Sequence, residues 1–196
     1  MKILWVNVCA HEVSRTLELS REFIGKYCEK HSVEVEIEEI RLFEEKNLDL
    51  FDWGRVNERL RLQKLKQWEN PMFDYARQWI EADRIIVSAP YWDLSFPAVL
   101  KVYMENIFVT GLSFYYDANG IPKGLSRADK LLYITTSGGP VKDKDMGYEY
   151  ISGCAKMLGI YETKRLAAEG LDVLQWDGSA ILQKAKLCAA ELAKTW

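Results

Sequence analysis

The chain has 196 residues, a formal net charge of -3 and a sequence pI near 5.6, and 48% of its residues are hydrophobic. This length and composition predict one α/β domain over residues 1–196 with a sizeable core. Charges of both signs are interspersed, so the basic patch of a nucleic-acid-binding protein is not indicated. No apolar run approaches the ~20 residues that span a membrane.

The cysteines and the amino terminus bear on the cellular compartment. Cys9, Cys28, Cys154 and Cys188 are widely scattered with no Cys-x-x-Cys. This spacing predicts neither a zinc site nor a disulfide framework. The amino terminus enters a strand directly and lacks the apolar region and cleavage site of a signal peptide. We therefore expect a cytoplasmic protein without a bound metal.

The first half of the chain alternates between strand and helix patterns. Residues 3–8 predict a short buried strand, and residues 33–40 predict a second strand with one wet face or an edge position. The stripe of the helix between them consists of Leu19, Phe23, Ile24 and Tyr27. The long charged crossover 41–83 is expected to hold one or two helices. Asn70-Pro71 should break it, because proline disfavours the α region in the residue before it. Residues 84–88 predict the third strand.

The second half continues the alternation. Pro97 should open a helix, because its fixed φ and missing N–H suit the first turn. Residues 108–129 are rich in turn formers, and a connection this long usually carries function or crosses to a partner. Residues 130–136 and 161–168 predict the fourth and fifth strands. The stripes of three helices consist of Leu100, Tyr103, Met104 and Ile107, then Tyr148, Ile151, Ala155 and Leu158, then Ile181, Ala185, Cys188 and Leu192. Right-handed βαβ crossovers make this a three-layer α/β/α sandwich around a parallel sheet.

The loop after the first strand carries groups that suit an anion. Ser14, Arg15 and Thr16 offer hydroxyls, a guanidinium and the free N–H groups of a helix start, which together can hold a phosphate. Serine is also a favoured N-cap of any helix, so a plain cap is the alternative interpretation. The chain has no Gly-x-Gly-x-x-Gly or Walker loop, which excludes the usual dinucleotide and nucleotide fingerprints.

Two further loops follow the third and fourth strands. Tyr91 and Trp92, in the loop 90–96, are candidates for stacking on a flat ligand, although aromatic residues also serve as core. The loop 136–139 ends in Gly138-Gly139, which lets a backbone approach a ligand closely; alone it is equally consistent with a simple turn. Doubly wound folds bind ligands at the carboxyl ends of their strands. The three loops together therefore predict a site for a flat aromatic cofactor.

With these segments in family order, the chain resembles the FMN-dependent NADH-azoreductases and related NAD(P)H:quinone oxidoreductases. The resemblance rests on Ser14-Arg15-Thr16, Ala89 to Pro97, Gly111 to Tyr116, Gly124-Leu125 and Thr135 to Gly139. It implies a flavodoxin-like fold with a five-stranded parallel sheet of order 2-1-3-4-5. It also implies FMN between the first and third strands, and a homodimer with two active sites at its interface.

The resemblance also assigns roles by position. It implies that Ser14, Arg15 and Thr16 form the phosphate loop, that Pro90, Tyr91, Trp92, Asp93 and Leu94 form the flavin-ring loop, and that Thr136, Ser137, Gly138 and Gly139 line the pyrimidine edge. Cys9 could approach the cofactor or act as a small buried hydrophobe. Phe96, Tyr115, Tyr116 and Tyr148 are candidates for the substrate pocket or for core packing. Family members often carry Met-Tyr-Asn-Phe where this chain has Tyr91 to Leu94. An Asp93 carboxylate pointing at the flavin would disfavour the anionic reduced form.

The activity implied is transfer of two electrons from NADH or NADPH, through FMN, to a quinone, azo compound or similar flat acceptor by a ping-pong mechanism. The flavin carries this chemistry, so no catalytic side-chain set is required. His11 and His31 are expected to be surface or capping residues. The alternatives are a flavodoxin-type electron carrier and a non-catalytic binding module. Carriers are usually strongly acidic around the flavin, and the near-balanced charge argues against one.

Overall fold

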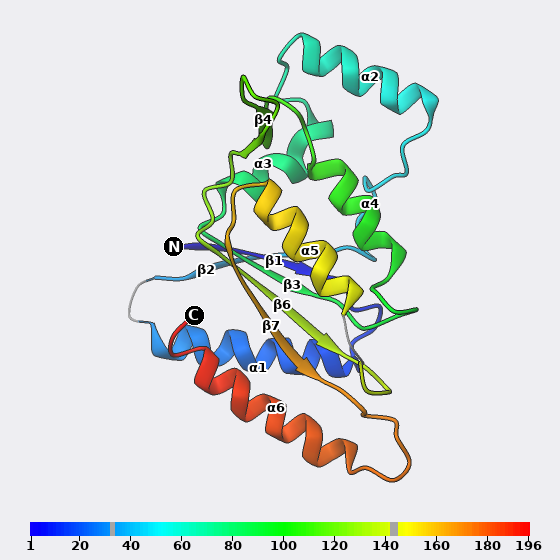
Figure 1. Ribbon diagram of the computed structural model, residues 1–196, viewed down its shortest axis with the longest axis vertical. Coiled ribbons are helices and arrows are strands. Elements are labelled where there is room, and N and C mark those ends of the chain that lie inside the picture. The colour runs from blue at the N-terminus through cyan, green and yellow to red at the C-terminus, as the bar shows by residue number, and fades with distance from the viewer. Residues whose placement is uncertain (32–33, 142–144) are drawn as a thin grey trace.

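A parallel sheet of five strands lies at the centre of the computed structural model, which describes residues 1–31, 34–141 and 145–196 (Figure 1). The strands are β1 (Lys2–Asn7), β2 (Glu36–Arg41), β3 (Arg84–Ser88), β6 (Lys130–Thr136) and β7 (Glu162–Ala168). Their order is β2-β1-β3-β6-β7, and each neighbouring pair is parallel. This is the order 2-1-3-4-5 that the sequence resemblance implied.

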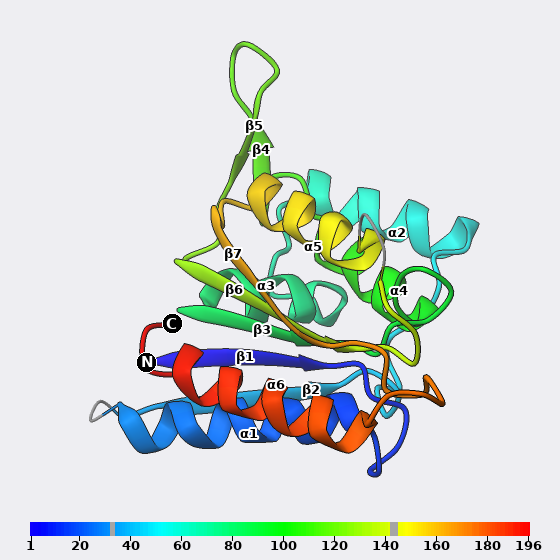
Figure 2. The same ribbon diagram turned by 60° about the horizontal axis from the view of Figure 1, so that its bottom comes forward.

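Helices cover both faces of this sheet (Figure 2). One face is covered by α1 (Arg15–Lys30) and α6 (Gly178–Leu192), and the other by α3 (Asp74–Glu81), α4 (Ala98–Ile107) and α5 (Met146–Met157). The central strands are buried on both sides for this reason. In β6, for example, every residue after Lys130 is buried. The three-layer sandwich predicted from the sequence is confirmed.

Strand β2 lies at the edge of the sheet and pairs with β1 alone in the described sheet. Its burial is partial, with Ile40 buried and Glu36 exposed, as the alternating sequence predicted. The strand begins at Glu36, later than expected. Val33, where the prediction placed its start, lies outside the described residues.

The crossover between β2 and β3 contains α2 (Trp53–Lys64), a short 3-10 helix over Pro71–Phe73, and then α3. The predicted break at Asn70-Pro71 is confirmed: the Asn70 side chain accepts a hydrogen bond from the Met72 N–H at 3.0 Å and caps the 3-10 helix. Helix α2 is tied to α4 by Arg59, whose guanidinium donates to the main-chain oxygens of Glu105 and Phe108.

Residues 108–129 contain a feature that the sequence analysis missed. Strands β4 (Phe114–Tyr116) and β5 (Pro122–Gly124) form an antiparallel hairpin that stands out from the body (Figure 2). Asp117 Oδ1 shapes its turn by accepting from the N–H groups of Asn119 and Ile121, both at 2.9 Å. The base of the hairpin packs on the carboxyl end of α5, where a Cβ on Gly124 would lie 1.8 Å from the Leu158 carbonyl carbon.

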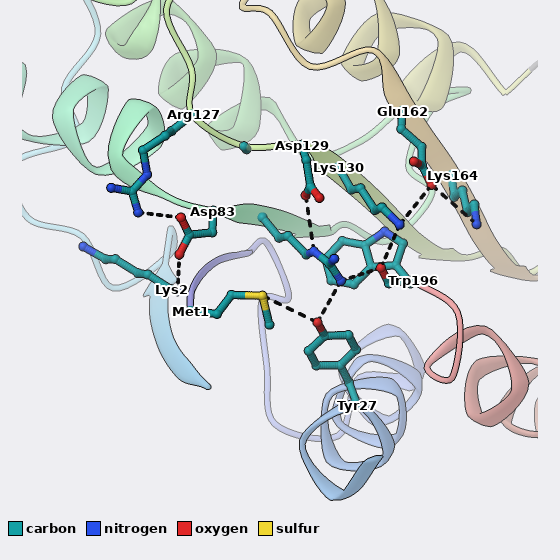
Figure 3. Close-up of polar contacts among 12 residues, drawn as sticks. Met1, Lys2, Tyr27, Asp83, Arg127, Asp129, Lys130, Glu162, Lys164 and Trp196 are labelled. Carbon is teal, nitrogen blue, oxygen red and sulfur yellow. Dashed lines mark hydrogen bonds and ion pairs between the residues drawn. The ribbon is translucent and has the colours of Figure 1, made fainter. Parts of the chain in front are cut away.

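The amino-terminal edge of the sheet is held by a polar network (Figure 3). Arg84 donates to the Tyr27 hydroxyl at 2.7 Å and to the main-chain oxygen of Trp196, which also accepts from Lys130 at 3.0 Å. The Trp196 ring is buried against Phe23 and Tyr27. This edge lies opposite the predicted site. Within the described ranges, no helix is both long and apolar enough to cross a membrane.

Candidate functional site

The loop between β1 and α1 ends in a capped helix start. Ser14 is the N-cap, and its hydroxyl accepts from the Leu17 N–H at 3.4 Å. Helix geometry leaves the N–H groups of Arg15 and Thr16 in the first turn without an intrahelical acceptor. The positive end of the helix dipole favours an anion there. The local geometry is therefore consistent with both a plain helix cap and a phosphate-binding site.

The Arg15 guanidinium is engaged by a residue that the sequence analysis missed. Its two terminal nitrogens donate to the two carboxylate oxygens of Asp172 at 2.8 and 3.0 Å, and one also donates to Leu171 O at 3.3 Å. This bidentate pair holds the pKa of Asp172 below its usual range. Asp172 follows β7, beyond the three loops that the sequence singled out, and carries no motif of its own. The pair links α1 to the connection between β7 and α6.

Thr136 joins the three predicted loops. Its hydroxyl lies 2.7 Å from the Thr16 hydroxyl, and both residues are buried. Its main-chain oxygen accepts from the Tyr91 N–H at 3.0 Å. The segments after β1, β3 and β6 therefore meet around a single residue at the carboxyl edge of the sheet. A ligand at this edge can touch all three.

The loop after β3 forms a tight turn whose tip is exposed. Trp92 and Ser95 exchange main-chain hydrogen bonds of 3.1 and 2.8 Å. Between them, Asp93 and Leu94 have φ angles of 49° and 68°, in the left-handed region that non-glycine residues rarely adopt. Such conformations cluster at ligand-binding sites. Trp92, Asp93 and Leu94 are exposed, and Pro90 and Tyr91 are half-buried at the base of the loop.

The loop after β6 is seated on the segment that follows β7. The Ser137 N–H donates to Ala168 O at 3.0 Å, and the Asp172 N–H donates to Gly138 O at 2.8 Å. At Gly138 a Cβ would lie 2.4 Å from an Asp172 carboxylate oxygen, so a larger residue there would displace the Asp172 side chain. The sequence analysis predicted the glycines of this loop but not the segment that supports them.

Of the four aromatic residues predicted for the substrate pocket, two lie near these loops and two lie on the hairpin. Phe96 is half-buried against Tyr150, with ring centroids 5.6 Å apart. Tyr148 lies in the first turn of α5, and its hydroxyl lies 3.1 Å from Thr163 O. Tyr115 and Tyr116 are exposed on the hairpin, which packs at the carboxyl end of α5, whereas the loops lie toward its amino end (Figure 1). Contact of the two hairpin tyrosines with a site therefore requires a second chain.

Cys9 and the two histidines show no sign of a catalytic role in their positions. Burial raises the pKa of the Cys9 thiol to about 11, so it is protonated at neutral pH. His11 is exposed. His31 follows α1 as its C-cap, with its ring centroid 4.0 Å from that of Tyr27. Cys9 is thus a half-buried thiol, and the histidines lie at surface and capping positions.

Comparison with known proteins adds to this geometry. Residues 1–192 match the model of the Flavodoxin_2 family, described as having a flavodoxin-like fold. The FMN-dependent NADH:quinone oxidoreductase of Lachnoclostridium phytofermentans is 32% identical over 197 residues, covering 98% of each chain. The FMN-dependent NADH:quinone oxidoreductase 2 of Clostridium acetobutylicum is 34% identical over 206 residues, also with 98% coverage of each.

Solved structures share the fold at lower sequence identity. An azoreductase from Bacillus anthracis superposes with a TM-score of 0.87 at 22% identity, covering 100% of this chain and 99% of that one. An FMN-dependent NADH-azoreductase from Bacillus anthracis in complex with FMN gives 0.84 at 24% identity, covering 98% and 97%. At these identities the superpositions establish the fold. By the match over residues 1–192 and by its relatives, the chain belongs to the Flavodoxin_2 family, together with these quinone oxidoreductases.

Proposed function

We propose that the chain is an FMN-dependent oxidoreductase that passes two electrons from NADH or NADPH to a quinone, an azo compound or a similar flat acceptor. The observation that carries this proposal is the convergence on Thr136, which joins the loops after β1, β3 and β6. The names of the relatives and their 32–34% identity over nearly the whole chain support it.

The residues at this edge fit FMN. A phosphate suits the first-turn N–H groups of Arg15 and Thr16, beside the Ser14 cap. A flat ring suits the surface formed by the loops 90–94 and 136–139, since both present backbone to one edge of the sheet. Cys9 lies at the base of the phosphate loop as a neutral thiol. These residues are the proposed cofactor site.

When bound, FMN supplies the chemistry by accepting a hydride from a nicotinamide and delivering the electrons to an acceptor. The chain's own residues bind, orient and shield. The N–H groups of the α1 start fix the phosphate, and the left-handed turn at Asp93 and Leu94 presents main-chain groups to the ring. Trp92 and Phe96 would border the bound ring, where donor and acceptor would bind in turn.

We further propose that two copies form a homodimer that works in the cytoplasm. The hairpin exposes Tyr115, Tyr116, Ile121 and Leu125, and an apolar surface of this kind on a projecting element suits a partner. The two tyrosines could then reach the loops of the second copy. The structure describes all four cysteines as free thiols, which suits a reducing compartment.

The test combines binding with steady-state kinetics. Apoprotein is titrated with FMN and, as a control ligand without phosphate, with riboflavin; FMN should bind much more tightly. Bound flavin should bleach anaerobically with NADH or NADPH before acceptor is added. Initial rates against donor and quinone should give parallel lines, because both substrates use one space. Absence of FMN binding would favour a flavin-free module, and a flavin that neither nicotinamide reduces would favour an electron carrier.

A further inference from the structure

The loop 137–141 is held by the segment 168–172 through main-chain contacts along its first half. The Leu171 N–H donates to Ser137 O at 3.1 Å, and the Gly170 N–H donates to Gly139 O at 3.2 Å. With the contacts of Ala168 and Asp172 described above, these bonds fix residues 137–139. Because they involve only the backbone, these bonds need no side-chain partner in either segment.

The far end of the loop depends on a side chain. Glu169 Oε2 accepts from the Val141 N–H at 2.8 Å. Its other oxygen, Oε1, accepts from Arg165 Nη2 at 2.6 Å, and Arg165 Nε donates to Asp145 Oδ2 at 2.7 Å. Asp145 is nearly buried and caps α5, accepting from the Tyr148 N–H at 3.0 Å. Arg165 therefore ties the carboxylate that holds Val141 to the start of α5.

The carboxylates of Asp145 and Glu169 act electrostatically on the loop 90–94. Burial and the neighbouring carboxylates of Asp145 and Glu169 raise the pKa of the Tyr91 phenol. Tyr91 is also bonded to Thr136 through its N–H. The group of Arg165, Asp145 and Glu169 thus holds the end of the loop 137–141 and carries one positive and two negative charges.

We infer that Glu169 is a positioning residue for the flavin: it fixes the end of the loop 137–141 and places a negative charge beside the pyrimidine edge. The inference rests on the proposed function. Hydrogen bonds and charge near the flavin ring tune its electronics. A carboxylate at this place should weaken binding of the reduced, more negative flavin and so lower its midpoint potential.

Glu169→Ala and Glu169→Gln test this. Glu169→Ala leaves the Val141 N–H without its acceptor, and we expect about tenfold weaker FMN binding, the loss typical of one hydrogen bond to a charged group. Gln can still accept from Val141, so Glu169→Gln should recover part of the affinity. Both variants remove the charge, so both should raise the midpoint potential of bound FMN. The readouts are flavin fluorescence titration, redox titration and the absorption spectrum of bound FMN.

Glu162→Gln is the matched control. Glu162 is at the other end of β7, where it pairs with Lys130 at 3.5 Å and Lys164 at 3.6 Å, away from the loops (Figure 3). It should leave both the affinity and the potential unchanged. If Glu169→Ala kept the wild-type FMN affinity and midpoint potential, the inference about Glu169 would be overturned but the proposed function would not. Equal shifts in Glu162→Gln would also overturn it, because they would indicate a general loss of stability. Failure of the wild-type chain to bind FMN would overturn the proposed function as well.

Discussion

Arg15 shows how a contact distant in sequence changes the interpretation of a motif. Ser14-Arg15-Thr16 suggests a guanidinium aimed at a phosphate, yet the guanidinium pairs with Asp172. The side chains are 41% and 63% exposed, and an exposed ion pair contributes about 1 kcal/mol or less. A phosphate dianion with the helix N–H groups behind it can therefore compete with Asp172 for Arg15.

Arg15→Ala should consequently weaken FMN binding by about tenfold to hundredfold, as expected for loss of a charge-assisted hydrogen bond. Riboflavin, which lacks the phosphate, should bind the variant as it binds the wild-type chain. Asp172→Asn is the matched variant: it releases the guanidinium, and its N–H still donates to Gly138 O, so FMN binding should not weaken. Equal losses for FMN and riboflavin in Arg15→Ala would remove the charged contact from the proposed site.

The residues that could be predicted at this scale carry local signals. Ser14 stands at a helix start and Gly138 stands at a close approach to Asp172, so their residue types indicate their places. Asp172, Glu169 and Arg165 act through pairs distant in sequence, with Arg15, Val141 and Asp145 respectively. A charged residue near a strand end has no period or spacing that names its partner. The supporting residues of the loops therefore could not be predicted from the sequence.

Among the elements, the parallel strands and packed helices were predictable because each has a repeating apolar pattern. The strands of the β4–β5 hairpin are three residues long, too short for alternation to be seen. What fixes the hairpin is a close approach of backbones: Gly124 at its base lies against Leu158 and Gly159. The Gly124-Leu125 pair is part of the family resemblance. The structure gives the physical reason for Gly124, which is this close approach.

Gly124→Ala should destabilise this contact. The new Cβ would lie 1.8 Å from the Leu158 carbonyl carbon and 2.0 Å from the Gly159 nitrogen. Neither backbone atom can rotate away, so the hairpin or the end of α5 must move, at a cost of about 1–3 kcal/mol or more. Gly153→Ala is the control, because a Cβ there meets nothing within 4 Å and alanine favours a helix. Thermal unfolding compares the two variants, and an unchanged midpoint in Gly124→Ala would contradict the packing.

At the scale of the molecule, the placement of aromatic residues separates the hairpin from the site of its own chain. The three loops gather at the carboxyl edge of the sheet, while the β4–β5 hairpin, which carries Tyr115 and Tyr116, projects near the carboxyl end of α5 (Figure 2). The opposite edge is occupied by the polar network around Arg84 and Trp196. In a dimer, each hairpin could cover the loops of the second copy. This arrangement would bury the exposed apolar residues of the hairpin and shield the open loops from water.

Light scattering at micromolar concentration should therefore give about twice the 22.7 kDa mass of the chain. Ile121 is 50% exposed near the hairpin turn, so Ile121→Asp should yield a folded monomer: it adds charge to the interface without entering the core. This monomer should lose quinone reductase activity, since its loops would stay open to water. Leu187→Asp is the control. Leu187 is 70% exposed on α6, on the other face of the sheet, and its variant should keep both mass and activity. A fully active monomeric wild-type chain would exclude the shared site.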